Sequence, residues 1–161
     1  MDNDLPSVVA ELGRRLGQVE DQLAIFKLIC TYGPAVDSGG GEAAAALWTD
    51  DGVYDSDTHV WRGHDEIAGL VEAGQHQTML AEGCAHILGF PRVTLDGDRA
   101  VATCYSRVYR RSADGYYVWR LAANRWELTR TPDGWRAVTR INRLIDGSDA
   151  ARRVLARGAA G

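Results

Sequence analysis

Apolar residues recur at alternating intervals of four and three along the first thirty positions of the chain. They stand at Leu5, Val9, Leu12, Leu16, Val19, Leu23, Phe26 and Cys30. This spacing predicts a helix with one apolar seam. Two interpretations stay open: the seam packs against its own domain, as in most amphipathic helices, or it is reserved for a second subunit.

The helical pattern continues to about Val36 and stops at Ser38-Gly39-Gly40-Gly41. Beyond it, the composition predicts a short alanine-rich helix over residues 42–48, an extended segment over 53–61 and another helix from Gly63 to about Ala81. The first half of the chain is therefore mainly helical.

The second half of the chain has the sequence pattern of β-strands separated by turn residues. The expected strands cover residues 85–95 with a break at Pro91, then 100–111, 116–129 and 135–145. Helices followed by an antiparallel meander indicate an α+β fold, and four long strands with helices on one face suit a curved sheet around a pocket. In the last strand, alternation places Arg136, Val138, Arg140 and Asn142 on one face, without showing which face looks inward.

Composition narrows the classes of partner. The 161 residues suit one domain, and a net charge of -4 without a basic run argues against nucleic acid. Lys27 is the only lysine, which leaves almost no candidate for a Schiff base. Three scattered cysteines predict buried thiols in a reducing compartment, and no apolar run is long enough for a membrane span. We expect a cytoplasmic protein without membrane contact.

Two polar residues stand out at positions where chemistry is plausible. His86 enters a strand within the apolar run 84–90, and Asp37 ends a helix, where the helix dipole disfavours a negative charge. Taken singly, each has an ordinary explanation, a hydrogen-bonded core histidine and a turn cap. His59 and His76 lie in polar stretches of the sequence and are expected in solvent.

An ordered set of motifs gives these residues a context. The set comprises Ile25-Phe26-x-Leu28, Tyr32, Val36-Asp37-x-Gly39, Leu47-Trp48-Thr49-Asp50-Asp51-Gly52-Val53-Tyr54, Gly63-x-x-x-Ile67, His86-x-x-Gly89-x-Pro91-x-Val93, Asp96-Gly97-Asp98 and Asp133-Gly134-Trp135-Arg136-x-x-x-Arg140. Over roughly residues 20–145 it resembles the SnoaL-like domain of the nuclear transport factor 2-like superfamily. The resemblance implies an α+β cone, in which a curved mixed or antiparallel sheet wraps around N-terminal helices and encloses a pocket.

The resemblance also implies roles for individual residues. Asp37 and His86 correspond to the catalytic dyad of dehydratase-like members, which needs no metal or organic cofactor. The expected substrate-binding residues are Tyr32, Tyr54, Arg140, Asn142 and Trp48. The implied activity is a lyase or isomerase that removes a proton from a small hydrophobic or polycyclic substrate, steroid-like or polyketide-like, in a homodimer or higher homo-oligomer.

Other activities within the superfamily stay open. Some members bind ligands or assemble with other subunits without catalysis, as do small subunits of ring-hydroxylating dioxygenases. An epoxide hydrolase of the limonene type needs an Asp-Arg-Asp set, of which only Asp37 and Arg140 are visible. Phe90 stands where many relatives carry asparagine. Ideal helical spacing sets Tyr32 and Asp37 about 140° apart, and Pro34 between them predicts a kink.

The expected domain organisation has three parts. Residues 1–19 form an N-terminal helical extension, residues 20–146 form the SnoaL-like cone, and residues 147–161 form a tail that is partly helical or mobile.

Overall fold

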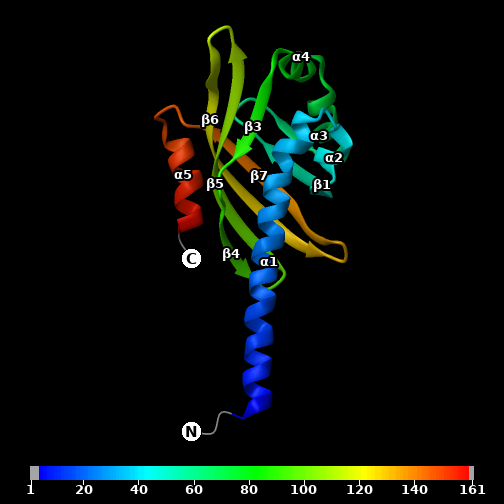
Figure 1. The fold of residues 1–161 in the computed structure, drawn as a ribbon, viewed down its shortest axis with the longest axis vertical. Helices are drawn as coiled ribbons and strands as arrows, with labels where there is room; N and C mark the ends of the chain where they lie inside the picture. The colour runs from blue at the N-terminus through cyan, green and yellow to red at the C-terminus, as the bar shows by residue number, and fades with distance from the viewer. Residues whose placement is uncertain (1–3, 160–161) are drawn as a thin grey trace.

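The computed structural model describes residues 4–159 of the chain (Figure 1). Helix α1 (Leu5–Asp37) runs without interruption through Pro34 and is followed by the short α2 (Gly41–Ala45). The helix expected over residues 63–81 is divided at Ala73 into α3 (Gly63–Glu72) and α4 (Gly74–Glu82). Helix α5 (Asp149–Ala159) lies at the end of the described chain.

One mixed sheet forms the body of the molecule. Its strands are β1 (Trp48–Asp55), β2 (Val60–Arg62), β3 (Cys84–Leu88), β4 (Arg92–Asp96), β5 (Arg99–Ser112), β6 (Gly115–Thr131) and β7 (Gly134–Leu144). The order is β2-β1-β7-β6-β5-β3, with β4 also paired to β5. Only the β1 and β7 pair is parallel among the described strands. The predicted α+β cone with a curved mixed sheet is confirmed.

The core lies between the inner face of the sheet and the helices of the first half. Ile25 and Ile29 of α1, Ile67 of α3 and the indoles of Trp48 and Trp126 are fully buried there. Burial of such side chains contributes roughly 1.5–3 kcal/mol each. Helix α5 covers part of the opposite face, where Ala151 and Val154 pack on Ala123 of β6. No described helix is long and apolar enough to cross a membrane.

A bulge in β7 determines which of its residues face the inside of the cone. Leu128 of β6 pairs with Ala137 and Glu127 pairs with Thr139, so Val138 is an extra residue without a partner. Alternation changes phase at a bulge. Trp135 and Ala137 are therefore buried before it, and Arg140 and Asn142 are buried after it. The prediction that Arg136, Val138, Arg140 and Asn142 share one face is wrong for this reason.

Candidate active site

Asp37 and His86 form a hydrogen-bonded pair where the end of α1 meets the start of β3. The Nδ1 atom of His86 lies 2.6 Å from Oδ1 of Asp37, and the backbone N–H of His86 donates to Oδ2 at 2.7 Å. Both side chains are largely shielded, with 14% of His86 and 23% of Asp37 exposed. Because the carboxylate accepts from Nδ1–H, the lone pair of the neutral imidazole is on Nε2. This is the arrangement of a base with its orienting group.

A glycine permits the helix to approach β3 this closely. A Cβ added to Gly33 would lie 2.1 Å from the carbonyl oxygen of His86. Asp37 lies one helical turn after Gly33, on the same face of α1. The close approach therefore positions the carboxylate behind the imidazole, while Tyr32 on the adjoining face lines the cavity. Asp37 and Tyr32 do not need to share a face, because His86 stands between the carboxylate and the cavity.

Substitution of Gly33 by alanine is expected to lower the free energy of unfolding by about 1–3 kcal/mol, because the new methyl group overpacks the contact between α1 and β3. The matched control is Gly69→Ala in α3, where an added Cβ meets nothing within 4 Å and alanine improves helix propensity. Thermal denaturation of both variants measures the difference. Equal stability of Gly33→Ala and wild type would contradict the close approach.

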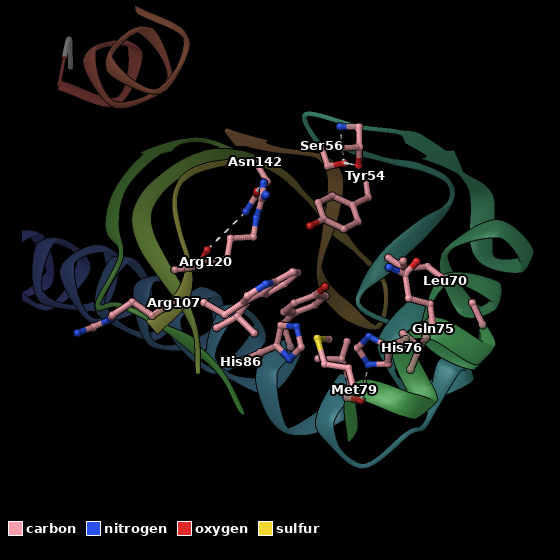
Figure 2. Close-up of a pocket in the computed structure, with 18 of the residues that line it drawn as sticks. Tyr54, Ser56, Leu70, Gln75, His76, Met79, His86, Arg107, Arg120 and Asn142 are labelled. Atoms are coloured by element: carbon pink, nitrogen blue, oxygen red, sulfur yellow. Dashed lines mark hydrogen bonds between the residues drawn. The ribbon is translucent and has the colours of Figure 1, made fainter. Parts of the chain in front are cut away.

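His86 of the dyad borders an open cavity of about 640 Å³ that is lined by residues of the sheet, α1, α3 and α4. Figure 2 shows His86 and His76 side by side at one end of this cavity, with Tyr54 and Asn142 across from them. Tyr32, Tyr54, Arg140 and Asn142 border the same cavity. The structure therefore brings His86, Tyr32, Tyr54, Arg140 and Asn142 together around one cavity.

Arg140 is a buried cation surrounded by aromatic rings. Its Cζ lies 4.0 Å from the ring centre of Tyr32 and 4.6 Å from those of Tyr54 and Trp126. The residue is 2% exposed, forms no salt bridge with any described carboxylate, and its Nη1 has no hydrogen-bond partner among the described residues. A guanidinium stays charged at every relevant pH. The cavity wall thus carries the positive charge of Arg140, which no described carboxylate compensates.

Amide side chains hold the other edge of this guanidinium. Nε and Nη2 of Arg140 donate to Oδ1 of Asn124 at 3.0 and 2.9 Å, and Nδ2 of Asn142 donates to the same oxygen at 2.9 Å. Asn124 in turn donates to Ser106, and Asn142 accepts from Arg120, which also pairs with Asp57. This network fixes the orientation of Arg140 against the rings.

Burial affects the protonation of the tyrosine beside Arg140. It raises the pKa of Tyr32 well above its ordinary value, although the positive charge of Arg140 acts in the opposite direction. The phenol therefore remains protonated and able to donate a hydrogen bond at neutral pH.

His76 is a cavity residue that sequence reasoning missed. Its ring centre lies 5.5 Å from that of His86, and its Nε2 lies 3.2 Å from the carbonyl oxygen of Val36. A carbonyl only accepts, so Nε2 carries a proton and Nδ1 is the acceptor of the neutral ring. Burial lowers the pKa of His76, which keeps it neutral at pH 7. The polar sequence Gln75-His76-Gln77 contains no signal of this half-buried position.

Two further expectations differ from the structure. Trp48 does not line the cavity: its buried ring packs against Tyr32 and Tyr54 from behind, and its Nε1 donates to the carbonyl of Val53. It supports the aromatic wall and does not face the cavity.

Of the three free cysteines, predicted to be buried, Cys104 is buried, Cys84 is partly buried and Cys30 is exposed. Burial raises the pKa of Cys104 to about 11, so this thiol stays protonated.

Comparisons with known proteins agree with this architecture. Residues 17–141 match the SnoaL-like domain. The chain belongs to the SnoaL-like family. A solved NTF2-like protein with a cystatin-like fold from Novosphingobium aromaticivorans is 44% identical over 96% of this chain and 99% of its own, with a TM-score of 0.88. No curated protein sequence matches the chain.

Two other solved structures are similar to this SnoaL-like protein at lower identity. One, from Novosphingobium aromaticivorans, is described as a proposed aromatic ring hydroxylase; it is 27% identical over 79% of this chain and 90% of its own, with a TM-score of 0.66. The other, a Mycobacterium tuberculosis protein of unknown function, is 22% identical over 89% of each chain, with a TM-score of 0.73, and shows the fold alone.

Proposed function

We propose that this SnoaL-like protein is a cofactor-independent lyase or isomerase of the dehydratase type, with His86 as its general base. The observation that carries the proposal is the hydrogen bond between Asp37 and Nδ1 of His86, which places the lone pair of the neutral imidazole on Nε2, in a ring that lines the cavity. Neutral imidazole is a suitable base for a carbon acid near neutral pH. The carboxylate holds the tautomer and stabilises the imidazolium that forms.

The opposite wall supplies the electrostatic partner of this base. When Nε2 takes the proton next to a carbonyl group, negative charge develops on the carbonyl oxygen. The guanidinium of Arg140 and the hydroxyl groups of Tyr32 and Tyr54 are the donors that stabilise it. In an elimination, the electrons of the enolate then form the C=C bond as the β-hydroxyl group leaves, and the imidazolium of His86 returns the abstracted proton to it, which gives water and neutral His86. In an isomerisation, the proton returns to another carbon instead.

The cavity indicates the class of substrate. A volume of about 640 Å³ with aromatic walls from Tyr32, Tyr54 and Trp61 suits a small hydrophobic or polycyclic molecule with a few oxygen atoms. Steroid-like and polyketide-like ketones have this combination. Ser56, Thr58 and Gln75 are the polar lining residues available to further oxygen atoms.

We infer further that the protein is a homodimer or higher homo-oligomer. The part of the outer sheet face that α5 leaves open exposes Ile87, Tyr105 and Leu121, with 38–51% of each residue exposed. Apolar side chains grouped on an open sheet face are suited to contact with another copy.

The test is proton exchange with solvent, which does not require the natural substrate. β-Hydroxy ketones of one to four rings are first screened for binding by thermal shift, and the binders are incubated in D₂O and followed by NMR and mass spectrometry. We expect enzyme-dependent deuterium incorporation at the α-carbon, or loss of water to the conjugated enone. Saturable binding without exchange or elimination would instead identify a ligand-binding module.

A further inference from the structure

The N-terminal half of α1 extends away from the rest of the molecule (Figure 1). The buried residues of α1 begin at Ile25, and the first ties to the domain are bonds from Asp21 to Arg130 and Trp135. All residues from 5 to 20 are exposed except the partly covered Val8 and Gly17. Of the two interpretations of the apolar seam, packing against its own domain is therefore wrong for the residues from Leu5 to Leu23.

The six apolar residues spaced by four and three from Leu5 to Leu23, here called the seam, remain in solvent within one chain. Their exposed fractions are 72% for Leu5, 59% for Val9, 55% for Leu12, 59% for Leu16, 62% for Val19 and 50% for Leu23. Spacing by four and three puts them at the a and d positions of successive heptads, with Val9, Leu16 and Leu23 at a. Side chains at these positions interlock with those of a second helix.

The segment has little support for its helical conformation within one chain. Gly13 and Gly17 each lower helix stability by roughly 1 kcal/mol relative to alanine, and the apolar face is exposed. Both glycines lie outside the a and d positions, so they do not interrupt the seam. Most helical stability in proteins comes from packing of the apolar face, which here requires another molecule.

Charges beside the seam indicate what that molecule is. Arg15 occupies a g position and Glu20 the e position five residues later, which face each other across a parallel, in-register pair of identical helices. Within the described chain neither takes part in an ion pair, whereas Glu11 is bonded to Arg14 and Asp21 to Arg130. An antiparallel pair with all six seam layers matched would instead place Arg15 opposite Arg15 of the other copy.

The seam continues onto the domain. Phe26, at the next d position, contacts Phe90 with ring centres 4.5 Å apart, and Phe90 itself is 82% exposed. Cys30, at the following a position, is exposed. A lipid surface is a poorer partner, because interfacial helices are rich in basic residues. Residues 5–24 instead carry two arginines against three acidic side chains.

We propose that residues 5–23 of α1 form a parallel, in-register coiled coil with the same segment of a second copy of this chain. The contact is separate from the outer sheet face and does not depend on the proposed enzymatic activity. Each pair brings two identical cones together at their α1 ends through a helical stem.

Site-directed cross-linking tests the register directly. In a parent carrying Cys30→Ser and Cys84→Ser, Leu12→Cys is compared with Gln18→Cys, which lies on the same helix outside the seam. A parallel pair brings the two Leu12 positions within the roughly 4.4–6.8 Å Cα separation that a disulfide spans. We expect Leu12→Cys to form a covalent dimer under mild oxidation on the order of tenfold faster than Gln18→Cys. Thermal denaturation of the parent and both variants is measured first, so that a difference in folding does not account for a difference in cross-linking rate.

The other outcomes overturn the proposal. Equal rates for the two cysteines would mean random collision. A cross-link that appears only when Leu12→Cys is mixed with Leu16→Cys would mean an antiparallel pair.

As a second measurement, Leu12→Glu/Leu16→Glu is compared with Ala10→Glu/Gln18→Glu, which adds the same charge outside the seam. We expect the Leu12→Glu/Leu16→Glu variant to have a weaker helical circular dichroism signal and a lower solution mass, or a solution mass that depends less on protein concentration. The Ala10→Glu/Gln18→Glu variant is expected to match the wild type in helicity and in solution mass. Unchanged helicity and mass in the seam variant would contradict the coiled coil.

Discussion

Replacement of His86 by alanine is expected to lower the rate of α-proton exchange or elimination by about 10²- to 10⁴-fold while the fold remains intact. The side chain is only partly buried and its hydrogen-bond partner Asp37 also reaches the backbone N–H of residue 86, which alanine retains. The measurement is the exchange rate in D₂O at saturating ligand, with circular dichroism as the test of folding. His64→Ala serves as control, because that imidazole binds the carbonyl of Trp48 and does not line the cavity.

Asp37→Asn is expected to cause a loss of the same order by a different route. An asparagine is nearly the same size, but it carries no charge to stabilise imidazolium and can present an N–H to Nδ1, which moves the proton of His86 to Nε2. The ¹⁵N chemical shifts of the imidazole report this tautomer independently of activity. Asp98→Asn, at an exposed carboxylate, is the control. Rates like those of wild type in both His86→Ala and Asp37→Asn would exclude the dyad as the catalytic base.

Periodicity and motif order predicted the parts of the molecule that depend on local sequence. The helix from Leu5 to Cys30 follows from the spacing of its apolar residues. Asp37 and His86 were identified because each occupies the end of an element next to apolar residues, and the ordered motifs supplied their relation. Their hydrogen bond could not be derived from spacing, because it depends on how closely α1 approaches β3 at Gly33.

Features that depend on several distant elements were not predictable in this way. The phase change at Val138 is set by the register of β7 against β1 and β6, which no period within β7 reveals. The rings around Arg140 come from α1, β1 and β6, so only the assembled sheet places them together. His76 enters the cavity because the predicted single helix is divided at Ala73, which turns α4 toward β3.

Arg140→Met is expected to separate stability from activity. Burial of a charge without a carboxylate partner costs several kcal/mol, and replacement of buried charges by apolar groups of similar volume is often neutral or stabilising. Asn124 remains satisfied, because its Oδ1 still accepts from Asn142 once both Arg140 donors are gone. The methionine thioether packs well among aromatic rings. We therefore expect a Tm equal to or above that of wild type.

The same substitution removes the cation that the proposed mechanism places opposite the developing negative charge, and loss of one such donor is expected to lower turnover by about 10²- to 10³-fold. Arg130→Met is the control for loss of an arginine outside the cavity. This partly exposed arginine pairs with Asp21 and Asp98 and does not line the cavity. The control variant should leave the exchange rate unchanged and leave Tm the same or slightly lower. A strongly lowered Tm in Arg140→Met would instead assign the guanidinium a structural role. An unchanged exchange rate would show that the charge develops elsewhere. Increased stability together with lost turnover would mean that the uncompensated charge is retained for catalysis at a cost to the fold.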